Sequence, residues 1–189
     1  MRILDLGGTA AYWSLFDRPI LEAQRVHITL INRKDEADHE RPPPADDPLF
    51  THEFGDACHL PQFEDNAFDL VHSNSVIEHV GLWPQMEAFA QEVRRLAPAY
   101  FVQTPYQWFP IEPHLEAAFI HWWSDRAQAR WIMRNRPNAR GDYGWAMRAI
   151  HSAYLLDKQQ MQYLFSDATH VDEKVFGLTK SLMAIRSPE

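Results

Sequence analysis

The sequence predicts an α/β protein built on a doubly wound mixed sheet of about seven strands. Short apolar, β-branched segments alternate with segments of helical periodicity through the first hundred residues, a pattern typical of a parallel sheet with right-handed crossovers. A glycine-containing turn directly follows the first apolar segment. Near the carboxyl end, two apolar segments are separated by a link too short for a parallel connection, so the last strand is expected to be antiparallel.

The first part of the chain is expected to supply five parallel strands. A helix is expected over about 10–24, after the glycine turn. A second is expected over 84–96, where Pro84 lies in the first turn and apolar residues recur at helical spacing. Residues 33–48 are polar and contain three consecutive prolines, which predicts a stiffened loop. The expected strands are residues 2–6, 26–31, 51–54, 68–73 and 99–104.

The regular pattern resumes near the carboxyl end. Asp157 is suited to the N-cap of a helix that is expected to end at Phe165. Two strands, 170–176 and 180–186, follow and are joined through Gly177. A turn this short requires the two strands to pair antiparallel.

Residues 105–155 do not fit the alternation of strand and helix. They contain five of the seven tryptophans, and they are expected to be helical from about 114 to 135. A segment this aromatic must bury its rings against something or line a site. We predict that this segment, 105–155, is a substrate-side cap within one domain spanning 1–189. The alternative is a helical layer packed on the side of the core.

Three arginines recur every four residues within the cap segment, which places Arg126, Arg130 and Arg134 on one helix face. Three interpretations remain open. The face is simply solvated, or it recognises a phosphate or carboxylate on a substrate, or it rests with neighbouring tryptophans on a membrane surface.

Composition narrows the class of protein. The chain has 189 residues, a formal net charge of −8 and one cysteine, Cys58. An acidic chain disfavours nonspecific nucleic-acid binding, so no nucleic-acid partner is expected. No internal disulfide can form, no apolar run approaches the roughly 20 residues of a membrane span, and no secretory leader is evident. A cytoplasmic location is therefore expected, and the oligomeric state stays open.

Four short segments carry a family resemblance. Asp5 and Gly7 flank one residue at the end of the first strand, and Gly55-Asp56-Ala57 follows the third. Asp65 to Val71 leads into the fourth strand, and Ser73 to Val80 continues from it. In order and spacing these segments resemble the class I S-adenosylmethionine-dependent methyltransferases, whose sheet is Rossmann-like. The resemblance covers residues 2–104 by motif and 157–186 by pattern.

The resemblance implies S-adenosylmethionine as cofactor, bound at the carboxyl ends of the first four strands. Two features depart from the family pattern. Thr9 and Ala11 stand where the family has further glycines, with Gly8 available to adopt permissive backbone torsions. Asn32 stands where an acidic residue usually binds the ribose, and an amide makes that contact without charge. The cofactor-binding residues implied are Asp5, Gly7, Gly8, Asn32, Asp56, Ala57 and Ser73.

Three residues are candidates for catalysis. His79 follows the fourth strand, and Glu112 and His114 lie two apart in a proline-rich loop after the fifth, on one side of an extended segment. An acceptor that must lose a proton needs such groups. The structural alternatives are a histidine that packs under the cofactor and a loop locked by its own hydrogen bonds. No metal site is expected, because metal-binding motifs are absent and His114 and His121 are seven residues apart.

The predicted function is methyl transfer from S-adenosylmethionine to a small-molecule or lipid-like acceptor by in-line displacement, with an anionic acceptor as one of the alternatives. The alternative is a protein of the same fold that binds the cofactor but is catalytically weak or inactive, which the departures at Thr9 and Asn32 motivate. An oxidoreductase of related fold is a third possibility, but the ribose contact of those enzymes is likewise acidic.

Overall fold

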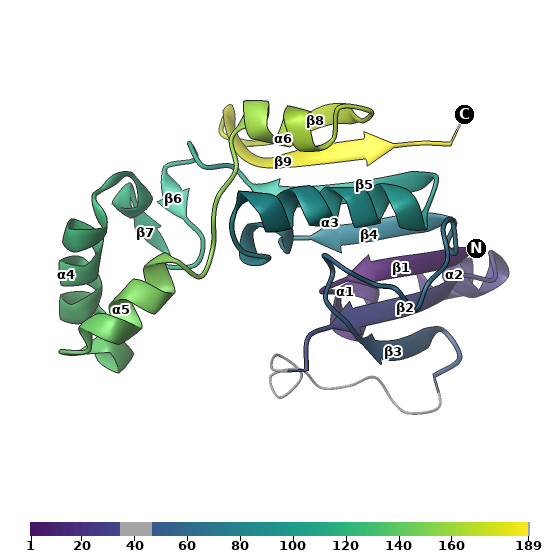
Figure 1. Ribbon diagram of the computed structural model, residues 1–189, viewed down its shortest axis with the longest axis horizontal. Coiled ribbons are helices and arrows are strands. Elements are labelled where there is room, and N and C mark those ends of the chain that lie inside the picture. The colour runs from purple at the N-terminus through teal and green to yellow at the C-terminus, as the bar shows by residue number, and fades with distance from the viewer. Residues whose placement is uncertain (35–46, 189) are drawn as a thin grey trace.

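The computed structural model describes residues 1–34 and 47–188, and its central feature is a seven-stranded sheet (Figure 1). The strand order is β3-β2-β1-β4-β5-β9-β8, in which the first five strands are parallel and β9 is antiparallel to both of its neighbours. The predicted doubly wound mixed sheet is confirmed. The strands are β1 (Arg2–Leu6), β2 (His27–Asn32), β3 (Phe50–Phe54), β4 (Leu70–Asn74), β5 (Ala99–Pro105), β8 (Thr169–Val175) and β9 (Leu178–Arg186).

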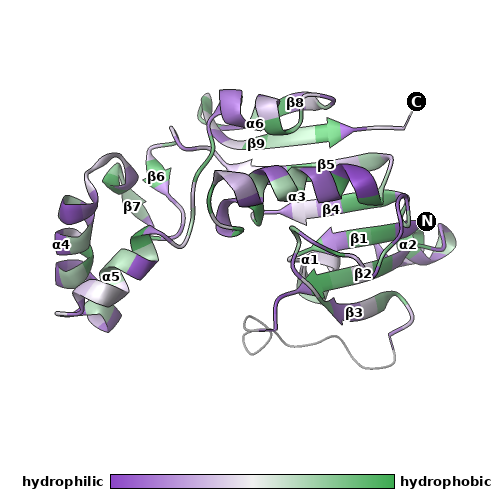
Figure 2. Ribbon diagram, in the orientation of Figure 1, coloured by the Kyte–Doolittle hydropathy of each residue, from purple (hydrophilic) through white to green (hydrophobic). Residues whose placement is uncertain are grey.

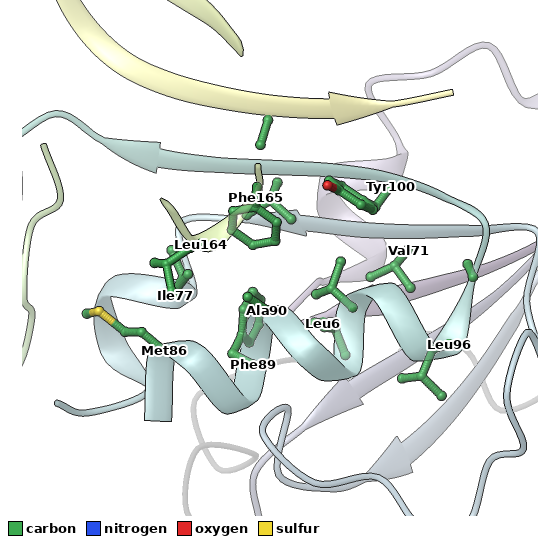
Figure 3. Close-up of a cluster of buried hydrophobic side chains, with 14 of the residues drawn as sticks. Leu6, Val71, Ile77, Met86, Phe89, Ala90, Leu96, Tyr100, Leu164 and Phe165 are labelled. Atoms are coloured by element: carbon green, nitrogen blue, oxygen red, sulfur yellow. The ribbon is translucent and has the colours of Figure 1, made fainter. Parts of the chain in front are cut away.

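One face of the sheet carries the larger core. Helices α3 (Trp83–Leu96) and α6 (Lys158–Leu164) bury their apolar sides against it. Figure 3 shows Phe89 and Ala90 of α3 directed toward Leu6 and the sheet, with Phe165 beside them. The apolar spacing that predicted α3 is therefore the spacing of its buried side.

The opposite face carries a smaller core around β1 and β2, covered by α1 (Ala10–Trp13) and α2 (Arg18–Ala23). Figure 2 shows hydrophobic residues concentrated along β2, which is buried on both faces. The single helix expected over about 10–24 is corrected to two. Pro19 lies in the first turn of α2, and its ring would clash with a carbonyl four residues earlier in a continuous helix.

A buried carboxylate joins the first strand to this second layer. Asp5 is fully buried, and its Oδ2 accepts a hydrogen bond of 2.6 Å from Trp13 Nε1. Its Oδ1 lies 2.7 Å from Nδ1 of His72 on β4. Because ionised groups are buried only when they are well partnered, these two contacts hold β1, α1 and β4 in one arrangement.

The segment predicted as a cap forms a separate lobe with its own small core, including Leu115, Ile120 and Ile132. Its first part is a hairpin rather than the helix expected from residue 114, a short 3₁₀ turn follows, and α-helix begins only at Asp125. In Figure 1 the lobe lies beyond the carboxyl ends of β1, β4 and β5. Its elements are β6 (Ile111–Glu112), β7 (Ala117–Ala118), η3 (Ile120–Trp122), α4 (Asp125–Asn135), η4 (Pro137–Ala139) and α5 (Tyr143–Ile150).

The two connections between the lobe and the sheet run side by side. Tyr106 and Leu156 form a parallel bridge, and the Gln107 amide donates a 3.0 Å hydrogen bond to the Leu156 carbonyl. The chain therefore leaves the sheet and returns to it at nearly the same place.

The expected helix N-cap and terminal hairpin are confirmed, whereas most of one expected loop lies outside the described residues. Asp157 is the N-cap of α6 as predicted. Phe176 and Gly177, with φ of 50° and 83°, form the two-residue turn between β8 and β9, as an antiparallel hairpin requires. Most of the predicted loop over 33–48 lies outside the described residues. In the described part of the chain, no helix has the length and apolarity needed to cross a bilayer.

We expect Trp13→Phe to lower the free energy of unfolding by about 1–3 kcal/mol, because Asp5 Oδ2 then stays buried without its donor. Urea unfolding followed by circular dichroism measures the change. The matched control is Trp123→Phe, since Trp123 is 46% exposed and a surface change costs within about 0.5 kcal/mol. Equal free energies of unfolding for Trp13→Phe and the wild type would show that the hydrogen bond from Trp13 to Asp5 does not stabilise the fold.

Candidate functional site

A cavity of about 310 Å³ opens at the carboxyl ends of the central parallel strands. Clefts at this edge of doubly wound sheets are the usual ligand sites, and the volume lies at the lower end of the range for small-molecule pockets. We call it the donor cavity. Four of the seven predicted cofactor-binding residues line it, namely Gly7, Asn32, Asp56 and Ala57, together with Ser75, His79 and others.

Gly7 forms the turn that closes the end of the donor cavity nearest β1. Its φ is +68°, a left-handed conformation that favours glycine. A Cβ at this position would lie 2.5 Å from Val76 Cγ2. The Gly7 amide donates to the Ile31 carbonyl at 2.8 Å, which ties the turn to β2. The turn at Gly7 can therefore pack this closely against Val76 only because Gly7 has no side chain.

Gly8 has a different role from the one expected. Permissive torsions are supplied by Gly7 and not by Gly8, whose φ is not in the left-handed region. A Cβ at Gly8 would lie 1.6 Å from Asp5 Oδ2, so Gly8 leaves room for the buried carboxylate. Thr9 is the N-cap of α1, and its hydroxyl accepts from the Tyr12 amide at 3.1 Å. Thr9 and Ala11, which replace glycines of the family pattern, are thus the N-cap and a residue of α1.

Asn32 and Asp56 present polar atoms at the wall of the donor cavity. Asn32 ends β2, and its Nδ2 donates to the Gly8 carbonyl at 3.0 Å, which leaves Oδ1 to accept from a ligand. Asp56 Oδ1 accepts from the Cys58 amide at 2.9 Å. Its Oδ2 makes no hydrogen bond within the described residues. Each side chain thus uses one atom for the fold and keeps an acceptor.

The other three predicted cofactor-binding residues do not line the donor cavity. Asp5 and Ser73 are fully buried, and Gly8 contributes only its carbonyl, to Asn32. Their part in cofactor binding remains a prediction. Asp5 and Gly8 contact the Gly7 turn or Asn32, which line the cavity, so any effect they have on a ligand there would be indirect. Sequence reasoning missed Val76 and Ser75, which line the cavity from the segment that follows β4.

The three predicted catalytic residues come together at one place. His79 ends η2 (Ile77–His79), and His114 lies in the link between β6 and β7. The two Nε2 atoms are 3.1 Å apart, and the ring planes are nearly perpendicular at 88°. Glu112 Oε1 lies 2.6 Å from His114 Nδ1, and the Leu115 amide donates to Oε2. We call these two histidines the histidine pair.

The Glu112–His114 contact changes the pKa of both groups. The hydrogen bond to Glu112 outweighs burial and raises the pKa of His114. Burial acts to raise the pKa of Glu112, but the hydrogen bonds from His114 and the Leu115 amide outweigh it, and the pKa lies below its usual value. Both shifts favour an ionised carboxylate that accepts from His114 Nδ1.

Glu78, which was not predicted as a site residue, lies beside the histidine pair. It is 1% exposed, and its Oε2 accepts from Thr104 Oγ at 2.9 Å, while its Oε1 has no hydrogen-bond partner. Burial raises the pKa of this carboxyl. Ligand atoms of Glu78, His79 and His114 all lie within 4.8 Å of one another. The adjacency of Glu78 to His79 in the sequence was the one signal that could have included it.

A second cavity, of about 260 Å³, lies in the cap lobe. We call it the cap cavity. His114 and Glu112 line one side of it, and His121, Asp125 and Gln128 line others. His79 lines the donor cavity and His114 the cap cavity, so the histidine pair lies between the two. The cap arginines at 126, 130 and 134 are exposed and do not line the cap cavity.

A third cavity, of about 450 Å³, lies beside β5 and shares Ser75 with the donor cavity. Gln103 and Tyr106 line it. Thr104, between them, is buried, and its hydroxyl donates to Glu78.

Comparison with solved structures finds similar folds at low identity. A chain from the complex of the Haloferax volcanii Trm112 methyltransferase activator with a methyltransferase is 13% identical, with 100% of this chain and 83% of that chain covered and a TM-score of 0.60. An S-adenosylmethionine-dependent methyltransferase from Methanosarcina mazei is 15% identical, with 100% and 93% covered and a TM-score of 0.53. The CurJ carbon methyltransferase is 11% identical, with 100% and 49% covered and a TM-score of 0.57. These likenesses are of fold.

Sequence comparison identifies the family. No curated protein matches the chain. The family model described as a methyltransferase domain matches residues 4–98, half of the chain, and this range contains the whole wall of the donor cavity. The chain therefore belongs to the methyltransferase-domain family and is a class I S-adenosylmethionine-dependent methyltransferase.

Proposed function

We propose that this enzyme methylates a small, polar, hydroxyl-bearing molecule held in the cap cavity, and that the histidine pair is the reaction centre. The observation that carries the proposal is the position of the pair between the two cavities. A methyl acceptor must reach the donor from the side opposite the sulfur, and alignment of this kind supplies about 7–11 kcal/mol of the barrier reduction. We further propose that residues 1–189 act as one domain, with 105–155 as its cap.

The donor cavity fits S-adenosylmethionine, which supplies a methyl group already activated by a positive sulfur. In our proposal, Asp56 Oδ2 accepts from the adenine amino group, and Asn32 Oδ1 accepts from a ribose hydroxyl. The absence of a side chain at Gly7 lets the turn pack against Val76, which also lines the cavity. Asp5 acts through the turn, by holding the segment from which Gly7 and Gly8 extend.

The histidine pair and Glu112 activate the acceptor. A hydroxyl oxygen must lose its proton as its bond to the methyl carbon forms, and the pair is the titratable group between the cavities. Glu112 holds the His114 ring through Nδ1, the arrangement in which a carboxylate orients a catalytic imidazole. Glu112 therefore positions His114 and keeps Nε2 directed at His79.

The lining of the cap cavity supports a polar acceptor. Glu112 and Asp125 contribute carboxylates, and His121 and Gln128 contribute further polar atoms. Such a lining favours a molecule that donates hydrogen bonds over the anionic or lipid-like acceptor first expected. The arginines of α4 lie on an exposed face, and of the three interpretations of that face we adopt the solvated one.

We expect Asp56→Ala to weaken S-adenosylmethionine binding about 10–100-fold, since a hydrogen bond to a charged group contributes about 1.5–3 kcal/mol. Isothermal titration calorimetry measures the affinity. Asp56→Asn keeps an oxygen for the Cys58 amide and separates the loss of the turn from the loss of the charge. Asp17→Ala, an exposed cap of α2 without a side-chain cap bond, is the control. Wild-type affinity in Asp56→Ala would remove Asp56 from the adenine site.

We expect His114→Ala to lower kcat about 10²–10⁴-fold, the range for loss of a group that assists proton transfer, with donor affinity unchanged. Transfer of a labelled methyl group to a panel of hydroxylated small molecules measures turnover. His52→Ala, an exposed histidine on β3, is the control. Normal turnover in His114→Ala would assign the loop a structural role.

A further inference from the structure

The hydrogen bonds of the histidine pair leave two lone pairs facing each other. His79 Nδ1 lies 2.8 Å from the Ser152 carbonyl, which can only accept, so Nδ1 carries the hydrogen. His114 Nδ1 likewise carries a hydrogen, because the Glu112 carboxylate accepts it at 2.6 Å. In the neutral rings both Nε2 atoms are therefore acceptors, yet they lie 3.1 Å apart. The contact is favourable only if one Nε2 carries a hydrogen or if a cation lies between the two atoms.

Either a proton or a metal cation could join the two nitrogens, and Glu78 distinguishes them. A proton shared by the Nε2 atoms leaves Glu78 Oε1 buried without a hydrogen-bond partner, which is unfavourable. A metal cation accepts lone pairs from both nitrogens and from the carboxylate together. Only the cation satisfies all three groups.

We propose that Glu78, His79 and His114 form a binding site for one divalent cation of the Zn²⁺ type. Zn–N bonds of about 2.0–2.1 Å place two tetrahedral nitrogen ligands about 3.3 Å apart, close to the 3.1 Å separation of the Nε2 atoms. Ligand atoms of all three residues lie within 4.8 Å of one another. The nitrogens are thus already spaced as ligands, and the carboxylate needs a small inward movement.

The surroundings of the three ligands support this assignment. Metal-binding histidines usually donate their other ring N–H to a carboxylate or backbone carbonyl. His114 does so to Glu112, and His79 does so to Ser152. Thr104 holds the second oxygen of Glu78. Two imidazoles and one carboxylate favour Zn²⁺ over Mg²⁺ or Ca²⁺, which prefer all-oxygen sites.

The site keeps a fourth position for a ligand from outside the protein, as catalytic zinc sites do. We assign that position to the acceptor oxygen, because the cation would lie between the donor and cap cavities. Coordination would lower the pKa of the hydroxyl, so that its proton leaves to water and not to the histidine pair, whose Nε2 atoms are then ligands. The oxygen bonds to the methyl carbon as the carbon–sulfur bond breaks and its electron pair stays on sulfur. The identity of this fourth ligand rests on the proposed function, whereas the three protein ligands do not.

The test uses Co²⁺, a spectroscopic substitute for Zn²⁺, and protein without a polyhistidine tag. After treatment with a chelator, the full chain is titrated with cobalt while visible absorption and bound metal are followed. We expect one equivalent to bind with the intense bands of four-coordinate cobalt. The bands should disappear in His79→Ala and weaken in Glu78→Gln, which keeps an oxygen for Thr104. His52→Ala should match the wild type.

Glu112→Gln keeps all three ligands and an oxygen for the Leu115 amide. We expect its cobalt affinity to fall about 10–100-fold, as is usual when a residue that orients a metal ligand is lost. Absence of four-coordinate bands in the wild type, or unchanged binding in His79→Ala, overturns the metal site. In that case donor calorimetry still reports on the proposed function. If the donor does not bind but the cobalt bands appear, the proposed function fails and the metal site stands.

Discussion

The buried carboxylate of Asp5 is the contact on which the donor side of the enzyme depends. It bonds in two directions, to Trp13 on α1 and to His72 on β4. A carboxylate in a protein interior is tolerated only with such partners, so the first strand, the first helix and the fourth strand are fixed together. The requirement spreads to Gly8, where any side chain would occupy the space of the carboxylate. The position of the cavity wall at Gly7 thus depends on the hydrogen bonds of Asp5, which does not itself line the cavity.

The acceptor side depends on a different arrangement, in which two distant parts of the chain meet. His79 follows β4, and His114 comes from the cap, 35 residues later. The hairpin of β6 and β7 presents His114, and η2 presents His79 and Glu78. The pair marks the boundary between the sheet and the cap. Chemistry proposed for this enzyme therefore requires both parts of the fold at once.

Sequence reasoning predicted the parts of the molecule whose patterns are local. The strands of the sheet and α3 follow from β-branched runs and from apolar spacing, and the terminal hairpin follows from its two-residue link. The hairpin at 111–118 has two-residue strands, too short for any periodicity, and its part from residue 114 was expected as helix. Pro19 divides a helix that looks continuous from its composition. The cluster of Glu78, His79 and His114 depends on tertiary contact, and no spacing rule for metal ligands covers it.

The paired connections at Tyr106 and Leu156 give the cap a particular relation to the rest of the enzyme. Both ends of the inserted segment are held together by backbone hydrogen bonds. A change in its length therefore places little constraint on the sheet, because each doubling of a loop's length adds only about 0.6 kcal/mol to the entropic cost of closing it. The cap also has its own core. Evolution can therefore exchange this segment, and with it His114 and the acceptor side that we propose, for another of different size, while the donor cavity at the end of the sheet stays as it was.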